Sequence, residues 1–307
     1  MNKVALVIIY NHQFNKNIEV IEKIYAGRFS NIFHLVPFYK GDRPNVIAVY
    51  ECSYFFNGYV AQGLNNFFST EFGHYFFIGD DLIINPAIDE NNYKDFLALD
   101  AHSCFIPRLS SIDENKNYWA NNITALFYNK LYNGVEAEKL LPDNETAKEK
   151  MQSFGVHNKP LEFYQIWKLP ASFIEWLRAT FWKPRFVLRY LYSMIRKKKY
   201  TTAYPLARSY ADMFVISADA IKEFSNYCGL FSATRLFVEL AIPTAMVFSA
   251  KKIVTEKDLL YKGKALWNEA DHSILNRYDH NLNALFNNFP ENCLYIHPVK
   301  LSKWKYQ

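Results

Sequence analysis

Residues 75–81 read YFFIGDD, an apolar run that is broken by a glycine and followed by two aspartates. Aromatic and β-branched residues favour a strand over 75–78, and a glycine such as Gly79 is typical of the point where a strand ends. Ligands bind at the carboxyl ends of strands in open α/β sheets, so Asp80 and Asp81 stand where a binding site is expected. Gly-Asp-Asp is also ordinary turn chemistry, and a plain turn is the alternative interpretation.

The segments before this run alternate between strand and helix patterns. Residues 4–10 are continuously apolar, which is typical of a strand covered on both faces. From apolar spacing we also predict strands over 32–39 and 46–50, and helices over 15–26 and 58–72. This alternation predicts an α/β fold with a mixed, mainly parallel sheet that is flanked by helices.

A second ordered region follows residue 209. Residues 210–217 read YADMFVIS and predict a strand. We predict helices over 218–227 and 233–241, with Pro243 ending the second one. The tail from residue 293 contains one short apolar strand and then a basic end.

Composition narrows the class of protein. The chain has 307 residues, half of them hydrophobic, so it can bury a core and is not a disordered chain. Its net charge of +5 is too small to indicate a nucleic-acid partner by itself. The four cysteines stand far apart with no CxxC pair, which argues against zinc ribbons and thioredoxin-type redox sites. No GxGxxG follows the first strand and no GxxxxGK[ST] occurs, which disfavours a Rossmann dinucleotide site and a P-loop.

Targeting signals are weak in this sequence. The N-terminal apolar stretch is too short for a signal-peptide core and lacks a small-residue cleavage site. No run of about 18 apolar residues occurs, so no membrane-spanning helix is expected. We therefore expect a cytoplasmic location.

The acidic pair resembles the metal-binding Asp-x-Asp element that follows a central strand in GT-A-fold glycosyltransferases. The element departs from that pattern, because Gly79 holds its first position if it is aligned on 79–81, and Leu82 holds its last if it is aligned on 80–82. The resemblance implies that Asp81 binds a divalent metal, Mn²⁺ or Mg²⁺. It also implies that Asp80 lies near the ribose or the sugar of the donor.

The same resemblance places the donor nucleotide over the ends of the first and third strands. Tyr10, Asn11 and His12 follow the first strand and are expected near the base or ribose, with Tyr50 and Glu51 as second candidates. A tyrosine ring can stack on a base, and an asparagine amide can read its edge. A buried tyrosine followed by a solvated loop is the competing interpretation.

Residues 209–246 resemble the acceptor-side half of bacterial and viral surface-polysaccharide transferases, in which two acidic residues match Asp212 and Glu239. Apolar neighbours surround Glu239, and burial raises the pKa of a carboxylate toward the range of a general base. An inverting transferase needs such a base, so either residue is a catalytic candidate. The structural alternatives are an ion pair of Glu239 with Arg208 or Arg235, or an exposed position on the helix.

Residues 295–300 read YIHPVK near the end of the chain. Histidine is a ligand of divalent metals and lysine is a phosphate binder. Several GT-A families bring a late histidine to the metal and a nearby lysine to the diphosphate. The resemblance therefore implies a metal-ligand role for His297 and a diphosphate role for Lys300. A surface histidine before a proline turn is the alternative.

A basic and aromatic segment fills residues 167–200. Such a mixture favours the headgroup region of an anionic membrane. The alternatives are stacking on single-stranded nucleic acid, a partner protein, or a helical pair packed on the core with solvated lysines. Its basic residues are Lys168, Arg178, Lys183, Arg185, Arg189, Arg196, Lys197, Lys198 and Lys199.

We expect one GT-A-like catalytic domain over 1–307. Residues 1–100 would bind the nucleotide sugar, 101–204 would form a variable helical segment with the basic aromatic insertion, and 205–307 would form the acceptor side. The expected function is transfer of a sugar from a nucleotide donor, a UDP-sugar, to a growing surface glycan or a lipid-linked glycan at the inner face of the cell membrane. No nucleic-acid partner is expected for this enzyme. The alternative is a peripheral membrane or nucleic-acid-binding protein led by 167–200.

Overall fold

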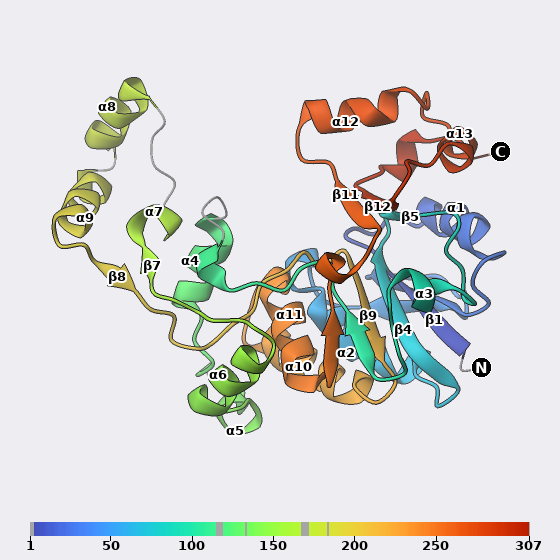
Figure 1. Ribbon diagram of the computed structural model, residues 1–307, viewed down its shortest axis with the longest axis horizontal. Coiled ribbons are helices and arrows are strands. Elements are labelled where there is room, and N and C mark those ends of the chain that lie inside the picture. The colour runs from blue at the N-terminus through green and yellow to red at the C-terminus, as the bar shows by residue number, and fades with distance from the viewer. Residues whose placement is uncertain (1–2, 115–118, 133, 167–171, 183, 307) are drawn as a thin grey trace.

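The central sheet forms the middle of the molecule (Figure 1). The computed structural model describes residues 3–114, 119–132, 134–166, 172–182 and 184–306. In this part of the chain the sheet has seven strands in the order β10-β6-β9-β4-β1-β2-β3, so β4 is the middle strand. The strands are β1 (Lys3–Ile9), β2 (Ile32–Pro37), β3 (Val46–Val49), β4 (Phe72–Gly79), β6 (Ser103–Phe105), β9 (Met213–Ser217) and β10 (Lys252–Val254).

Most strand pairs of this sheet are parallel. β1 is parallel to β2 and β4, β2 to β3, and β6 to β10, whereas β9 runs antiparallel to both of its neighbours. The prediction of a mixed, mainly parallel sheet is confirmed. The chain order reverses at β1, because β2 lies on one side of it and β4 on the other. Such a reversal creates a crevice at the carboxyl ends of the two strands.

Two hydrophobic cores cover the two faces of the sheet. Successive residues of a strand point to opposite faces, so Leu6 and Ile8 enter one core while Val7 and Ile9 enter the other. On one face lie α2 (Asn57–Phe67), α10 (Ile221–Ala233) and α11 (Val238–Ser249), and on the other α1 (Lys16–Tyr25) and the C-terminal segments. The predicted burial of both faces of the first strand is confirmed.

A second, small sheet joins the C-terminal part of the chain to the acidic pair. Its order is β11 (Lys262–Ala265), β12 (Cys293–His297) and β5 (Ile83–Ile84). β5 begins two residues after Asp81 and pairs antiparallel with β12. Helices α12 (Glu269–Asn276) and α13 (Leu282–Asn287) lie between β11 and β12 in the chain.

The helical arm projects away from the central sheet (Figure 1, left). We give this name to α8 (Phe173–Trp182), α9 (Pro184–Ile195) and the residues up to 198. A two-stranded ribbon of β7 (Leu161–Glu162) and β8 (Lys199–Tyr200) joins the arm to the body. Two basic residues of the segment 167–200, Lys168 and Lys183, lie outside the described residues. The remaining helices are α3 (Tyr93–Phe96), α4 (Trp119–Phe127), α5 (Ala137–Leu140), α6 (Asn144–Ser153) and α7 (Phe163–Ile166).

Several predicted helix boundaries are wrong. The helix expected over 218–227 runs from Ile221 to Ala233, and the one expected to begin at 233 begins at Val238. The helix expected over 58–72 ends at Phe67, because Phe68 is already extended and the chain then turns into β4. The helix expected to stop before Pro243 instead runs from Val238 through Pro243 to Ser249. Proline lacks the N–H that would bond the carbonyl four residues earlier, and in this protein that carbonyl, of Glu239, accepts a hydrogen bond from the Ser209 amide at 3.1 Å.

In the described part of the chain, no helix combines the length and the apolar character that crossing a membrane requires.

Candidate active site

The acidic pair lies at the crevice between β1 and β4. The Asp80 amide donates to the Ile9 carbonyl at 2.9 Å, which joins the ends of the two strands. The strand order reverses at this point, and in open α/β sheets ligands commonly bind at such a reversal. The sequence therefore delivers two carboxylates to the place in the sheet where ligands bind.

The Asp80 carboxylate holds the loop between β1 and α1. Its Oδ1 accepts from the Asn11 amide at 3.4 Å, and its Oδ2 accepts from Asn17 Nδ2 at 3.1 Å. Burial, together with the charge of Asp81, raises the pKa of Asp80 to about 6. Both oxygens are engaged within the protein, so Asp80 fixes the loop between β1 and α1.

Asp81, Asp212 and His297 form a cluster on the other side of the crevice. His297 Nε2 lies 3.2 Å from Asp81 Oδ1 and 3.6 Å from Asp212 Oδ1. Burial lowers the pKa of His297, but the carboxylates of Asp81 and Asp212 outweigh burial, and the net pKa is raised. Burial raises the pKa of Asp212, against the influence of His297. The three side chains come from β4, the segment before β9 and β12, and are brought together only by the fold.

The small sheet places His297. Ile296 of β12 pairs with Ile83 of β5, and the Val299 amide donates to the Asp81 carbonyl at 2.6 Å. Lys300 follows directly and is exposed to solvent. The tail is therefore held next to Asp81 on both sides of Pro298, and it brings His297 to the acidic pair.

Gly79 lies close to the Asp81 carboxylate. A Cβ atom at this position would lie 3.2 Å from Asp81 Oδ1, tighter than ordinary van der Waals contact. The Gly79 amide also donates to the Asp212 carbonyl at 2.9 Å, and this hydrogen bond restricts movement of the backbone away from Asp81. The glycine that departs from the Asp-x-Asp pattern therefore makes room for the Asp81 carboxylate.

Glu239 occupies a separate position, in the first turn of α11. Asn121 Nδ2 donates to its Oε2 at 2.5 Å, and the helix N-terminus favours its negative charge. Burial raises the pKa of Glu239, Asn121 opposes this, and the charge of Asp212 raises it further. The alternative of an ion pair with Arg235 is wrong, because Arg235 pairs with Glu51 at 2.8 Å.

The candidate nucleotide-contacting residues after β1 and β3 differ in their exposure and in their partners. Tyr10 is fully buried and its hydroxyl lies 3.0 Å from His34 Nδ1, so its ring does not stack on a nucleotide base, and this expectation is corrected. His12 is exposed beside the crevice, and Tyr50 is 66% exposed after β3. The carboxylate of Glu51 is engaged with Arg235, as described above.

Sequence reasoning missed several aromatic residues at the site. Trp267 is exposed and lies against Tyr210, with ring centroids 5.6 Å apart. The Leu266 amide donates to the His297 carbonyl at 2.7 Å, which places Trp267 beside the cluster. On the β1–β3 side, the exposed ring of Phe38 packs edge-on against Tyr50 at 5.9 Å. Phe38 directly follows β2, and Trp267 follows β11 by two residues, and this position after a strand is the signal that could have identified them.

Two members of the cluster, Asp81 and His297, have the spacing of adjacent metal ligands. Asp81 Oδ1 is buried and makes no hydrogen bond of normal geometry among the described residues, and it faces His297 Nε2. Adjacent donor atoms in an octahedral site with ligands at about 2.1 Å are about 3 Å apart, close to this separation. Over the described ranges, no three His, Cys, Asp or Glu side chains are placed to hold one ion together. The residues thus fit an ion that takes its other ligands from phosphate and water, as Mg²⁺ commonly does.

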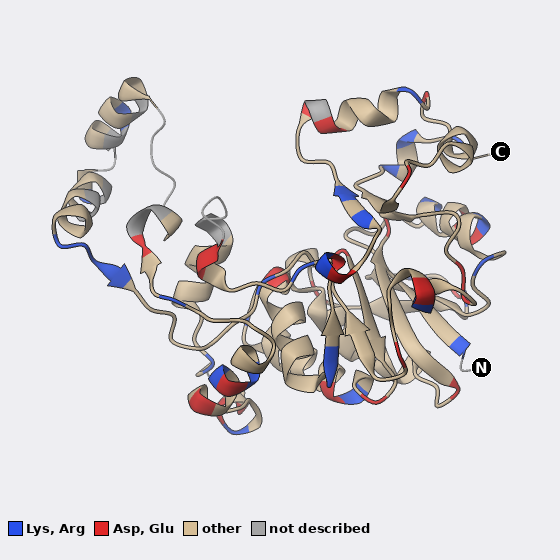
Figure 2. Ribbon diagram, viewed as in Figure 1, with Lys and Arg blue, Asp and Glu red and all other residues tan. Residues whose placement is uncertain are grey.

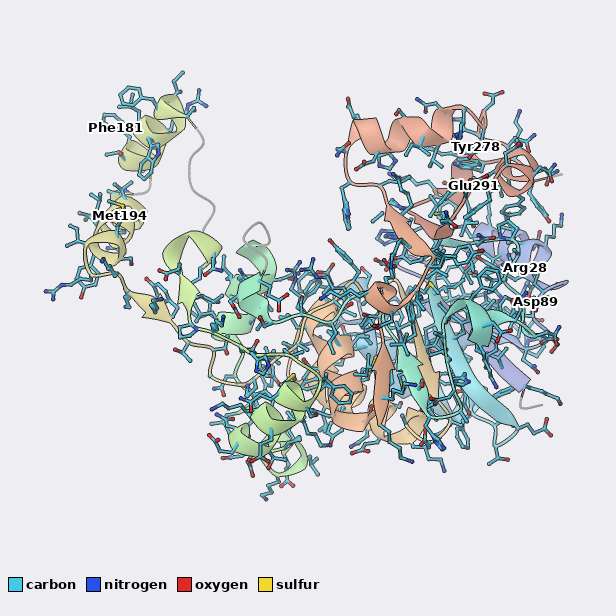
Figure 3. All side chains as sticks on the ribbon, in the orientation of Figure 1. Arg28, Asp89, Phe181, Met194, Tyr278 and Glu291 are labelled. Atoms are coloured by element: carbon cyan, nitrogen blue, oxygen red, sulfur yellow. The ribbon has the colours of Figure 1, made fainter. Side chains whose placement is uncertain are left out.

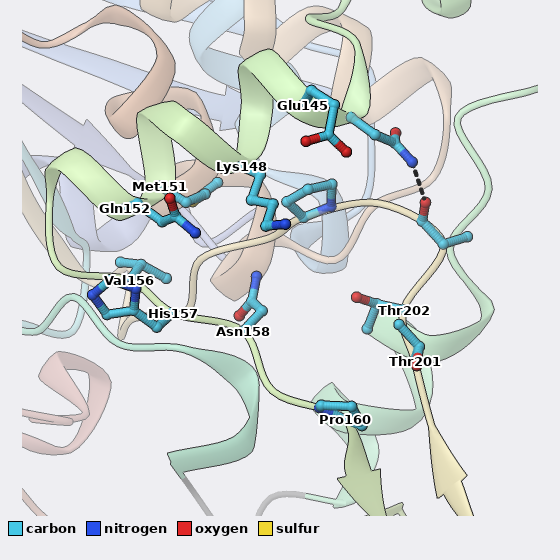
Figure 4. Close-up of a pocket in the computed structure, with 13 residues that line it drawn as sticks. Glu145, Lys148, Met151, Gln152, Val156, His157, Asn158, Pro160, Thr201 and Thr202 are labelled. Atoms are coloured by element: carbon cyan, nitrogen blue, oxygen red, sulfur yellow. Dashed lines mark hydrogen bonds between the residues drawn. The ribbon is translucent and has the colours of Figure 1, made fainter.

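A separate cavity lies between α6 and the chain segments on either side of the helical arm (Figure 4). Its volume is about 370 Å³, and polar side chains such as Lys148, His157 and Asn158 line it. Asn144 Nδ2 donates to the Ala203 carbonyl at 3.0 Å beside it. No predicted site residue lines this cavity, so it is not part of the acidic crevice.

The ionisable residues of the candidate site come from four distant parts of the sequence, namely Asp80 with Asp81, Asp212, Glu239 and His297. A scan of the chain against models of known protein families gave no match, and a search of curated protein sequences gave none either.

Proposed function

We propose that the protein is a glycosyltransferase of the GT-A type, which moves a sugar from a nucleotide donor, most simply a UDP-sugar, to a hydroxyl group of a glycan acceptor. The observation that carries the proposal is the convergence of Asp81, Asp212 and His297 at the crevice between β1 and β4. Two carboxylates that both lie within 3.6 Å of the same histidine, Asp81 at 3.2 Å and Asp212 at 3.6 Å, are costly to desolvate unless a ligand or metal uses them.

The position of the cluster in the fold supports this assignment. The acidic pair ends the middle strand of a mainly parallel sheet, as the resemblance to GT-A enzymes leads us to expect. The late histidine reaches the same edge through the small sheet, and Lys300 follows it three residues later in the chain. The contact between Asp81 and His297 supports the assignment of these two residues.

The donor would lie with its diphosphate at Asp81, His297 and Lys300. A divalent ion held by Asp81 and His297 would supply Lewis-acid stabilisation of the leaving diphosphate. Lys300 would contribute a positive charge to the same phosphates. Asn11 and His12, on the loop that Asp80 holds, would face the nucleoside.

Glu239 is the proposed general base. Its raised pKa and apolar surroundings suit a group that accepts the proton of the acceptor hydroxyl. The oxygen of that hydroxyl forms a bond to the anomeric carbon, the bond from this carbon to the diphosphate oxygen breaks, and the configuration inverts. Asp212 is the second candidate for this role, but it already faces His297. The exposed Trp267 offers a flat apolar surface for an acceptor sugar.

The test is calorimetric binding of UDP with and without Mn²⁺, to the wild type and to Asp81→Asn. Metal-dependent binding that the substitution abolishes supports the proposal and justifies a screen of donors. Binding that ignores both the metal and the substitution removes the role of Asp81. Absence of binding to UDP and to other nucleotides rejects the proposal.

A nucleotide-sugar hydrolase on the same site is the second candidate function, since the same cluster could activate water. Donor turnover measured with and without a glycan acceptor separates the two. An enzyme whose turnover is unaffected by any acceptor is a hydrolase.

A further inference from the structure

The helical arm exposes an apolar stripe on α9. Leu188, Leu191, Tyr192 and Ile195 recur at the spacing i, i+3, i+4 and i+7, which places them on one side of the helix. A stripe of this kind ordinarily faces a core. In this protein the four side chains are 66%, 42%, 55% and 77% exposed, respectively. The expectation of a helical pair packed on the core is therefore wrong for this stripe.

The neighbouring helix repeats the pattern. In α8, Ile174, Leu177 and Phe181 recur at i, i+3 and i+7, and Phe181 is 81% exposed. Figure 3 shows the side chains of Phe181 and Met194 on the arm, well away from the central sheet. α8 packs against α9, and α9 also contacts α7. Despite those contacts, the side chains of both apolar stripes remain 42–81% exposed.

Positive charge accompanies the stripes. Residues 172–199 contain eight Lys and Arg residues and one acidic residue, Glu175, a net charge of 8 − 1 = +7 against +5 for the whole chain. Figure 2 shows the blue of Lys and Arg along the connection from α9 into β8. Within this segment Lys199 pairs with Glu162 at 2.9 Å. The exposed basic side chains are Arg178, Arg185, Arg196, Lys197, Lys198 and Lys199.

We propose that the helical arm docks the protein on an anionic lipid bilayer. The apolar stripes would enter the boundary between headgroups and acyl chains, and the basic residues would meet the anionic headgroups. Charge complementarity favours this occupant over a second copy of the chain, because symmetric pairing of arms would bring two +7 segments together. It is also favoured over nucleic acid, because the aliphatic side chains of Leu188, Leu191 and Ile195 cannot stack on bases.

This inference does not depend on the proposed function, because the arm carries no residue of the acidic cluster. Binding is measured by co-sedimentation with vesicles of phosphatidylcholine alone, or of phosphatidylcholine and phosphatidylglycerol in equal parts. The variants are Leu188→Glu with Ile195→Glu, and Lys197→Glu with Lys198→Glu. Leu260→Glu is the matched control, since Leu260 is 74% exposed on the body of the protein.

The wild type should bind the anionic vesicles about tenfold or more tightly than the neutral ones, and added salt should weaken that binding. Each double variant should lose about tenfold or more in affinity, whereas Leu260→Glu should bind as the wild type does. All four side chains that are changed are exposed, so the melting temperature should stay the same and report intact folding.

Three results would overturn the inference. The first is no wild-type binding to either vesicle, and the second is binding that both double variants retain. The third is a concentration-dependent dimer, seen by analytical ultracentrifugation without vesicles and lost in the Leu188→Glu, Ile195→Glu variant, which would assign the stripes to a second copy. Nucleotide binding by each variant, measured in parallel, keeps failure of this inference distinct from failure of the proposed function.

Discussion

His297 Nε2 lies 3.2 Å from Asp81 Oδ1, so the last strand of the small sheet completes a site that begins at the end of the middle strand of the main sheet. The contact is supported from the backbone, since the Val299 amide donates to the Asp81 carbonyl. A ligand that uses Asp81 therefore depends on docking of the C-terminal segment. Binding of such a ligand should also stabilise that docking.

The first prediction concerns His297. His297→Gln should weaken Mn²⁺-dependent UDP binding about tenfold or more, because an amide is a poor substitute for an imidazole ligand. Calorimetry checks this. Lys303→Gln is the control, since Lys303 is exposed in the same tail and lies outside the cluster. Equal metal dependence in the wild type and His297→Gln would exclude His297 as a ligand.

The second prediction concerns Glu239. In Glu239→Gln the side-chain oxygen can still accept from Asn121, but the general base is lost, so kcat should fall about 100-fold or more while nucleotide binding is unchanged. The measurement is steady-state transfer with a donor and acceptor identified by the screen. Glu149→Gln, at an exposed position of α6, controls for loss of charge. If Glu239→Gln keeps the wild-type kcat, Glu239 is not the general base and Asp212 becomes the candidate for this role.

The third prediction concerns Trp267. Trp267→Ala should raise KM for a glycan acceptor about three- to tenfold and leave the KM for the donor unchanged, because the indole would contact only the acceptor. Trp267 is exposed, so stability should be little affected. Saturation curves for the two substrates separate these effects. A change confined to the donor KM would place Trp267 on the nucleotide side of the crevice.

The fourth prediction is a pH dependence of stability. The pKa of Asp80 is raised from 3.8 to about 6 by burial, so its contribution to stability is fully present below pH 3.8 and is lost as the pH rises through about 6. Asp80→Asn cannot titrate. The stability of Asp80→Asn relative to the wild type should therefore increase across this range, by about 2–3 kcal/mol.

Denaturant unfolding at several pH values measures that difference. Any constant cost of the amide at Asn17 cancels, because only the change with pH is compared. A difference between the two proteins that is the same at every pH would show that the pKa of Asp80 is not raised.

Much of the fold was predictable from local pattern. The continuous apolar run of the first strand and the Gly-Asp-Asp that ends β4 indicated a sheet buried on both faces with acidic residues at its edge. Pro243 misled the prediction for α11, because proline tolerance depends on whether another donor satisfies the freed carbonyl. In this case the donor is the Ser209 amide, which is distant in sequence.

The site was predictable in part. The types of residue at Asp81 and His297 suggested their chemistry, but only the pairing of β5 with β12 brings them to 3.2 Å. Tyr10 was misassigned because an apolar run does not show where burial ends. Trp267 was missed because its neighbour, Tyr210, belongs to another segment. Periodicity reveals the stripe on α9, but it does not reveal whether anything covers it.

The β7–β8 ribbon has a consequence for how this molecule can change. Leu161 lies opposite Tyr200, so the helical arm leaves and rejoins the body at almost the same point. Because β7 and β8 pair with each other, the helical arm between them can be shortened, lengthened or exchanged without shifting the register of the central strands. The central sheet with its acidic cluster and the helical arm can therefore change in sequence independently of each other.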